Sequence, residues 1–244
     1  MNRMRSACVV GLGMMLCLAV RGMAADAPPE GFEPVFNGKD LTGFKPRDKQ
    51  KMDDLQQHWT FKDDGVIAYN PAGKKGEMTL WTAKEYGDLV LMLDWRWVGP
   101  AQKMQRPYID PATGEEKKDA SGKVMSEEVL EYDSGVYLRG SPKSQVNMWN
   151  WPCGSGEVYG YRMDKSLPQS VRAGVTPKKK MDKPNGEWNH MVITMKGDRL
   201  TVQVNGEEVI TQAQLPGVAA KGPIAFQDHG EGFELRNVYI KELK

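Results

Sequence analysis

The chain has 244 residues and a formal net charge of +1, with 33 Lys and Arg residues against 32 Asp and Glu residues. This balance excludes the strongly basic surface with which nucleic-acid-binding proteins contact phosphates. Two of the three cysteines lie within the first 17 residues, and we predict below that this segment is removed. Cys153 would then have no partner for an internal disulfide, so we expect it to be buried and inert.

The first 25 residues have the layout of a secretory signal peptide. Arg3 and Arg5 precede an apolar run at residues 7–20, and small residues follow at Ala24 and Ala25. The run is shorter than the roughly 20 residues that cross a bilayer, so no stable membrane insertion is expected. We therefore predict a signal peptide at residues 1–25 and a single domain at 26–244, in a secreted or periplasmic protein. Removing the three arginines of the signal leaves 30 basic against 32 acidic residues.

Short apolar runs between turn signals recur along the rest of the chain, which favours an all-β sandwich or barrel. The run at residues 87–99, "GDLVLMLDWRWVG", is the first strong strand. Alternation predicts one face made of Leu91, Leu93, Trp95 and Trp97, and the other of Val90, Met92, Asp94 and Arg96. The run "SGVYLRG" at 134–140 alternates as well, with Val136 and Leu138 opposite Tyr137 and Arg139.

Two long connections separate the strands. Residues 99–128 and 161–187 are rich in charge, glycine and proline and have no apolar periodicity. We predict inserted surface loops there, the first of them with room for a small hairpin. Loops of this length on an all-β domain are often functional.

The clearest repeat of strand and turn lies at residues 186–210. The runs "HMVITMK" and "RLTVQV" are predicted strands joined at Gly197-Asp198. Asn205-Gly206 then supplies the positive φ angles of a type I′ hairpin turn, and "EEVI" returns. The last predicted strand is "FELRNVYIKEL" at 233–243.

The stretch at residues 144–161, "SQVNMWNWPCGSGEVYGY", combines amides with aromatic rings. On a strand, one face would carry Gln145, Asn147, Trp149 and Trp151. Such a face suits a sugar, because hydroxyls need donors and acceptors and the pyranose C–H face stacks on indole. Core packing is the alternative interpretation. A continuing strand would place Glu157, Tyr159 and Tyr161 together, where Glu157 is either structural or an acid or base of raised pKa.

Among the three histidines, we interpret His58 and His190 as structural. His229 follows Asp228 in a turn before the last strand, and loops on a rigid scaffold often carry functional residues. A plain surface turn is the alternative. The spacing contains no His-x-His pair and no cysteine-rich motif, yet a divalent metal held by His229, Asp228 and distant carboxylates stays open.

Retaining sandwich glucanases need two carboxylates about 5–5.5 Å apart. The run "EYDSGV" supplies Glu131 and Asp133 but has Val136 where another Glu would be required. This near miss counts against two-carboxylate hydrolysis, and it leaves Glu131 and Asp133 as a solvated strand entry.

Five blocks in order carry a resemblance to a known family. They are "PVFNGKDLTGF", "DSGVYLRG", "SQVNMWNWPCGSGEVYGY", "GEWNHMVITMKGDRLTVQVNG" and "GPIAFQDHGEGFELRNVYIKEL". The chain resembles the 3-keto-disaccharide hydrolase family over roughly residues 31–243. The resemblance implies a concanavalin A-like jelly roll of two antiparallel sheets with a concave sugar-binding face. Many relatives carry Glu-x-Gln-x-x-Asp where this chain has "QVNMWN", so Gln145 and Asn150 replace the acidic ends.

The resemblance also implies cleavage of glycosides that are already oxidised to a ketone at C3, by elimination and hydration. On that basis His229 is the candidate acid or base, oriented by Asp228 or a distant carboxylate, with Glu157 as a further proton-transfer group. The candidate substrate-binding residues are Arg139, Asn147, Trp149, Trp151, Tyr159, Tyr137 and Asn150. A non-catalytic carbohydrate-binding module and a secreted protein-interaction sandwich are the alternative functions.

Overall fold

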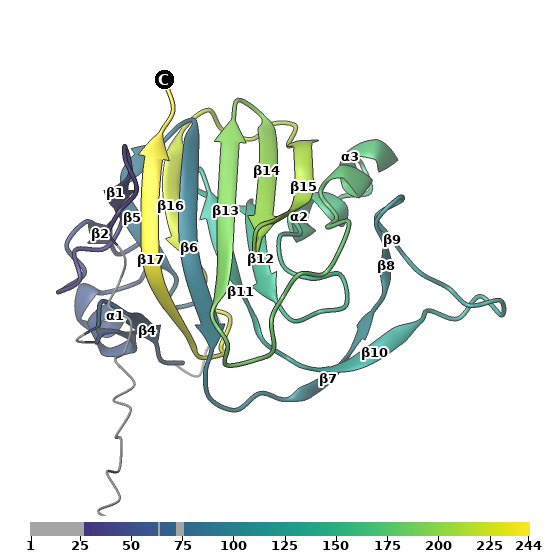
Figure 1. Ribbon diagram of the computed structural model, residues 1–244, viewed down its shortest axis with the longest axis horizontal. Coiled ribbons are helices and arrows are strands. Elements are labelled where there is room, and N and C mark those ends of the chain that lie inside the picture. Colours follow the sequence, from purple (N-terminus) through teal and green to yellow (C-terminus); the bar gives the residue numbers. More distant parts are fainter. Residues whose placement is uncertain (1–26, 63, 72–75) are drawn as a thin grey trace, which may run out of the picture.

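The computed structural model describes residues 27–62, 64–71 and 76–244 (Figure 1). The predicted signal peptide at residues 1–25 lies outside the described residues. Within the described part of the chain, no helix is long and apolar enough to cross a membrane.

An eight-stranded antiparallel sheet forms one layer (Figure 1). Its strand order is β15-β14-β13-β6-β17-β4-β3, and β1 also pairs with β17. The strands are β1 (Glu33–Pro34), β3 (Trp59–Phe61), β4 (Ile67–Tyr69), β6 (Leu89–Trp97), β13 (Asn189–Lys196), β14 (Arg199–Val204), β15 (Glu207–Gln214) and β17 (Phe233–Glu242). The helix α1 (Met52–His58) leads into β3.

A five-stranded antiparallel sheet forms the other layer, in the order β12-β11-β16-β5-β2. Its strands are β2 (Phe44–Lys45), β5 (Leu80–Tyr86), β11 (Asp133–Leu138), β12 (Ser141–Trp149) and β16 (Gly222–Phe226). The predicted sandwich of two antiparallel sheets is therefore confirmed.

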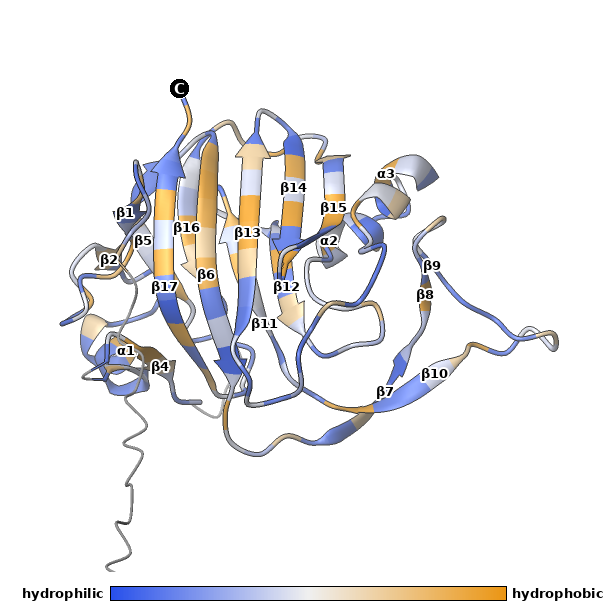
Figure 2. Ribbon diagram, in the orientation of Figure 1, coloured by the Kyte–Doolittle hydropathy of each residue, from blue (hydrophilic) through white to orange (hydrophobic). Residues whose placement is uncertain are grey.

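The core lies between the sheets and follows the predicted alternation. Leu91, Leu93 and Trp95 of β6 are fully buried, and Val136 and Leu138 of β11 contribute to the same apolar cluster. Figure 2 shows this pattern as alternating hydrophobic and hydrophilic bands along the strands. Burial of such side chains contributes roughly 1.5–3 kcal/mol each, so the alternation accounts for much of the stability of the sandwich.

The hairpin after β14 also forms as predicted. Asn205 and Gly206 have φ angles of 51° and 86°, the left-handed conformation that a type I′ turn needs at both central residues. The chain therefore passes from β14 to β15 through the turn that the Asn-Gly pair indicates.

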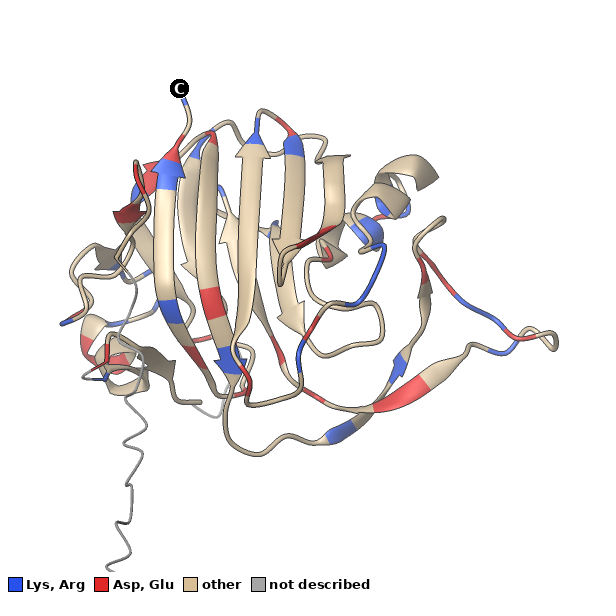
Figure 3. Cartoon of the chain, in the orientation of Figure 1, with Lys and Arg blue, Asp and Glu red and all other residues tan. Residues whose placement is uncertain are grey.

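The two long connections contain more structure than surface loops. The first forms an arm, residues 103–130, built from β7 (Lys103–Pro107), β8 (Ile109–Asp110), β9 (Glu115–Glu116) and β10 (Ser126–Leu130). Strands β7 and β10 pair with each other, as do β8 and β9. The arm extends away from the sheets and carries many of the charges in Figure 3.

The second connection contains α2 (Tyr159–Arg162) and α3 (Gln169–Gly174). Glu115 of the arm pairs with Lys165 and Arg172, at 2.6 and 2.5 Å, and so ties the arm to this region. The predicted strand through Glu157, Tyr159 and Tyr161 is wrong. Strand β12 ends at Trp149, and the chain then turns through glycines of positive φ before α2 begins.

Candidate functional site

A pocket of about 310 Å³ opens on the outward face of the five-stranded sheet. It receives side chains from β11, β12, the corner after β16, the arm and the segment at the start of α2. Its lining residues are Arg106, Asp133, Pro142, Gln145, Asn147, Trp149, Trp151, Tyr159, Gly160, Gln227 and His229. Five of the residues that the sequence singles out therefore meet here: His229, Asn147, Trp149, Trp151 and Tyr159.

Amide side chains form one part of the pocket lining. The Gln145 Nε2 donates to the side-chain oxygen of Gln227 and to the Ser134 carbonyl, the latter at 3.3 Å. The backbone N–H and Nδ2 of Asn147 both donate to the Glu157 carbonyl, at 2.9 and 3.1 Å. These contacts hold the amides in place, as a sugar-binding surface requires.

Aromatic rings form another part. Trp149 and Trp151 stack with centroids 4.0 Å apart and an interplanar angle of 6°, and Tyr159 meets both edge-on at 6.2 Å. Within the described residues the Trp151 indole N–H has no hydrogen-bond partner. Trp149 is 2 % and Trp151 9 % exposed, so the more open ring at the pocket is that of Tyr159, which is 39 % exposed.

Arg106 reaches the pocket from the arm. Its guanidinium lies 4.1 Å from the centroid of the Trp151 ring and binds Glu131, whose carboxylate accepts from Nε at 2.8 Å and also from Nη2. A forked ion pair of this kind fixes the cation in one orientation. Arg106 was not among the predicted site residues, because no local sequence pattern indicates the strand pairing that brings the arm to the pocket.

His229 lies between two carboxylates. Its Nδ1 is 3.3 Å from Oε2 of Glu231 and 3.6 Å from Oδ2 of Asp133. The His229 side chain is 28 % exposed, against 10 % for Asp133 and 14 % for Glu231. Acceptors at Nδ1 favour the tautomer with the proton there, which leaves the basic lone pair on Nε2.

Asp133 is thus a buried pocket residue and not a solvated strand entry. Its place could have been found from strand parity, since Asp133 and Tyr137 lie on the same face of β11. Between them, Gly135 leaves room for a neighbour: a Cβ there would meet the Gln145 side chain at 2.5 Å and the Val146 carbonyl at 2.6 Å. Glu131 is not a solvated residue either, because it is 5 % exposed and its carboxylate pairs with Arg106.

Asp228 lies next to His229 in sequence but faces a different segment. It is 1 % exposed, and its carboxylate accepts from the N–H groups of Met78 and Gly230, at 3.1 and 3.0 Å. Its backbone N–H donates to Thr79 Oγ1 and its carbonyl accepts from Gly76. These contacts join two loops, and none of them is with His229, which Asp228 was predicted to orient.

Glu157 is fully buried behind the pocket and does not line it. Burial raises the pKa of its carboxyl to about 7, although the ion pair with Arg162 lowers it. Asn147 contacts only the backbone carbonyl of Glu157, and the Glu157 carboxyl is 0 % exposed and pairs with Arg162. The structure therefore does not bring the Glu157 carboxyl to the pocket with His229.

Arg139 also lies away from the pocket. Its φ angle is 50°, so the chain leaves the strand geometry and the side chain turns toward the end of the sandwich. The guanidinium binds the carbonyls of Gly87, Gly197 and Ala219 and the carboxylate of Asp88. These partners make Arg139 a tie between loops, in place of the predicted substrate contact.

Tyr137 and Asn150 lie outside this pocket too. Asn150 accepts a hydrogen bond from the Tyr132 N–H at 3.3 Å, and its carbonyl accepts from Lys180 at 2.9 Å. Tyr137 lies on the same sheet face but lines a neighbouring pocket, and burial raises the pKa of its hydroxyl to about 12. Of the other singled-out groups, Cys153 is buried beside Trp149 and Trp151.

Whether a divalent metal ion could bind near His229 depends on how the side chains that could ligate it are arranged. Among the described residues, no group of three or more His, Cys, Asp or Glu side chains is placed to hold a metal ion. His229 contacts both carboxylates through the same ring nitrogen, by a hydrogen bond of 3.3 Å with Glu231 and at ion-pair distance, 3.6 Å, with Asp133. We derive no step through a metal.

Comparisons with known proteins agree with a carbohydrate-related sandwich. Three crystal structures of candidate glycosyl hydrolases from Parabacteroides distasonis are similar in fold. The first is 20 % identical, covers 88 % of this chain and 95 % of its own, and has a TM-score of 0.55. The second is 22 % identical, covers 88 % and 85 %, and has a TM-score of 0.53. The third is 19 % identical, covers 87 % and 99 %, and has a TM-score of 0.52.

A comparison with curated proteins finds no match. A family model, described as the 3-keto-alpha-glucoside-1,2-lyase-like domain, matches residues 31–241 and so covers both sheets and every residue that lines the pocket. With its all-β sandwich and its pocket of amides and indoles, the chain belongs to the family of 3-keto-alpha-glucoside-1,2-lyase-like domains.

Proposed function

We propose that the protein cleaves the glycosidic bond of 3-keto-glycosides, by elimination followed by hydration, in the pocket around His229. The observation that carries this proposal is the position of His229, which is held between Asp133 and Glu231 in a pocket otherwise lined by amides and aromatic rings. A histidine with an oriented ring is the commonest general base, and the other lining suits a sugar.

The ketone at C3 determines the chemistry. It acidifies the hydrogen on C2, so a base can remove that proton and leave an enolate across C2 and C3. The enolate then reforms the ketone while a double bond forms between C1 and C2 and the bond from C1 to the leaving oxygen breaks. Addition of water across the C1–C2 double bond returns the proton to C2 and completes a net hydrolysis.

His229 is the proposed base for C2, acting through Nε2. Asp133 and Glu231 hold its ring and stabilise the imidazolium that forms when the proton arrives. The imidazolium can return the proton to the leaving oxygen or, after water adds, to C2. This use of one histidine explains why two flanking carboxylates of the glucanase kind are not required.

Arg106 is the proposed stabiliser of the enolate. Its guanidinium is fixed by Glu131 and by the face of Trp151, so the positive charge needs no reorganisation when the negative charge develops. The Trp151 indole N–H supplies another donor at the same wall. Gln145 and Asn147 would bind sugar hydroxyls, and the ring of Tyr159, which is 39 % exposed, would pack against the pyranose.

The test uses the purified protein on matched substrates. We expect release of the leaving sugar from 3-keto-trehalose and none from trehalose itself, with slower turnover when C2 carries deuterium. Assays are run both with EDTA and with an added divalent cation, since no proposed step depends on a metal. Saturable binding of trehalose without turnover of either substrate would support a non-catalytic carbohydrate-binding module and overturn the enzyme.

A further inference from the structure

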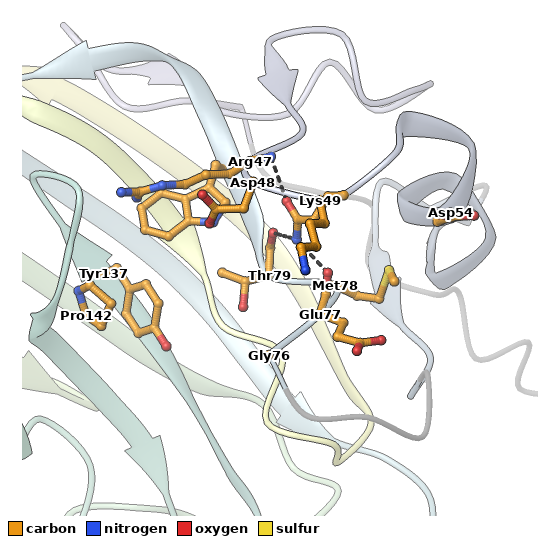
Figure 4. A pocket seen from close by; sticks show the side chains of 12 residues that line it. Arg47, Asp48, Lys49, Asp54, Gly76, Glu77, Met78, Thr79, Tyr137 and Pro142 are labelled. Atoms are coloured by element: carbon orange, nitrogen blue, oxygen red, sulfur yellow. Dashed lines mark hydrogen bonds between the residues drawn. The ribbon is translucent and has the colours of Figure 1, made fainter.

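A larger pocket, of about 570 Å³, opens on the same side of the five-stranded sheet (Figure 4). Among the residues that line it are Arg47, Asp48, Lys49, Glu77, Trp81 and Tyr137. Its volume is nearly twice the 310 Å³ of the His229 pocket. The proposed chemistry at His229 makes no use of this space.

The two pockets are joined along one row of the sheet. Tyr137 pairs with Gln145 on one side and with Ala225 on the other, and Ala225 pairs with Trp81. Gln145 lines the His229 pocket, Trp81 lines the larger one, and Pro142 lines both. Since neighbouring strands lie about 4.8 Å apart, Gln145 and Trp81 are about 14 Å apart across the sheet.

The polar residues of the larger pocket suit a neutral, hydroxyl-rich ligand. Arg47 and Lys49 can donate hydrogen bonds to a ligand, whereas the carboxylate of Asp48 can accept them. Charges of both signs disfavour a strongly ionic ligand. Hydroxyl groups donate and accept, so a sugar can use both kinds of partner.

Two aromatic rings, those of Trp81 and Tyr137, form the floor of this pocket and are 6 % and 9 % exposed. Trp81 and Tyr137 have ring centroids 5.6 Å apart, and the small side chain of Ala225 packs with them. The Arg47 guanidinium lies over Trp81 at 4.1 Å from its centroid (Figure 4). The stacked pair presents a planar cationic face above the sheet.

Hydrogen bonds hold the walls of the pocket in place without a ligand. Gln50 donates to the carbonyls of Glu77 and Thr79, at 2.7 and 2.9 Å, and accepts from the Arg47 N–H at 2.9 Å. Asp228 anchors the same wall through Met78. A wall that is already ordered loses less entropy when a ligand binds.

We propose that the larger pocket binds the third sugar unit of an oligosaccharide whose oxidised ring lies at His229. A hexose ring spans little more than one strand spacing, so two rings are too short to reach from the His229 pocket to Trp81. The leaving unit then lies over Gln145, Pro142 and Tyr137, and the unit after it lies against Trp81 and Arg47. This inference rests on the proposed function and names its substrate class as oligosaccharides of three or more units.

The test compares glucose oligomers of two, three and four units that carry the ketone at C3 of the non-reducing end. In the wild type, kcat/KM is expected to be about tenfold higher for three units than for two, as hydrogen bonds to charged groups allow. The variants Arg47→Ala and Asp48→Ala change exposed side chains, and each is expected to bring this ratio close to one. Lys51→Ala, which removes a nearby lysine that does not line the pocket, should leave the ratio unchanged.

Equal kcat/KM values for all three lengths in the wild type would overturn the third-unit site and leave the proposed function standing. Absence of turnover at every length would overturn the proposed function instead. In that case calorimetry with the unoxidised trisaccharide decides the site. Binding that Arg47→Ala weakens at least tenfold supports the site, and absence of binding, or equal binding by the variant, refutes it.

Discussion

Among the residues that the structure describes, two histidine–aspartate pairs occur, one with its aspartate on each sheet. In the pocket, His229 Nδ1 lies 3.6 Å from Asp133. On the eight-stranded sheet, His190 Nδ1 lies 2.6 Å from Asp94. The second pair is the shorter contact, so distance alone would not select the pair that we propose as reactive.

The surroundings of the two pairs differ in kind. Asp94 also accepts hydrogen bonds from Arg236 at 3.2 Å and from Asn237 at 2.9 Å, and Arg236 in turn lies over Trp188. Asp133 faces a pocket of amides and indoles, with Arg106 at its wall. A histidine beside a carboxylate is therefore a candidate active site only where a pocket and polar groups that could bind a substrate lie next to it.

The largest difference in activity between the two pairs is expected when each histidine is replaced by alanine. His229→Ala is expected to lower kcat for a 3-keto-glycoside at least a hundredfold, because the proposed base is lost. His190→Ala should stay within threefold of the wild type. The measurement is a steady-state assay of the two variants with matched circular dichroism spectra. Full activity in His229→Ala would remove the distinction between the pairs.

Changing the aspartates should give opposite results in activity and stability. Asp133→Asn is expected to lower kcat about tenfold to a hundredfold, since it weakens the group that orients His229. Asp94→Asn should leave kcat nearly unchanged but lower the free energy of unfolding by about 2–3 kcal/mol, because it weakens a buried network. Urea unfolding and activity are measured on both variants.

Equal losses of activity in the two asparagine variants would contradict this division. Glu242→Gln serves as the control for stability. Its carboxylate is 47 % exposed and pairs with Lys84, so its removal should change the free energy of unfolding by less than 1 kcal/mol.

The smallest expected effect concerns pH. Burial raises the pKa of Glu157 from its ordinary value of 4.5 to about 7, which exceeds the opposing effect of Arg162. The folded state therefore binds this proton more tightly than the unfolded state, so its stabilising contribution is full below pH 4.5 and is lost as pH rises through 7.

For Asp94, burial favours a higher pKa, but His190 and Asn237 outweigh it and lower the pKa. Its contribution is lost as pH falls below 3.8.

Thermal melting between pH 4.5 and 7.5 checks the sign of the Glu157 effect. The wild type should lose a few degrees of Tm from this group over that range, and Glu157→Gln should be flatter, although lower overall because Arg162 loses its partner. Glu187→Gln, on an exposed turn, is the control for the general effect of pH. A steeper profile in Glu157→Gln would show that the sign is wrong.

The sandwich was predictable because burial imposes a period of two on its strands. Leu91 and Leu93 are fully buried whereas Val90 and Met92 beside them are only partly buried, and the Asn205-Gly206 turn has its own chemical signature. The same parity brought Asn147 and Trp149 to the pocket face. Both features depend on only a few consecutive residues, so they can be predicted from a single sequence.

The rest of the site depends on where the chain bends and which segments meet. Arg139 departs from its predicted face because its φ angle is positive, and Glu157 lies beyond glycine turns that end the strand. Arg106 reaches the pocket only through pairing within the arm. Asp133 was not predicted as a site residue, because the sequence lacks the second carboxylate of the glucanase pattern. The proposed elimination does not require that pattern.

The contacts of Asp228 have a consequence for redesign. Its carboxylate and backbone attach the segment at Gly76–Thr79 to the corner that carries His229. A transplanted or lengthened segment would therefore have to present N–H groups to Asp228, or the corner would lose its support. The Asp228 contacts therefore link the wall of the larger pocket to the corner of the proposed base, so a change in that wall would also alter how His229 is held.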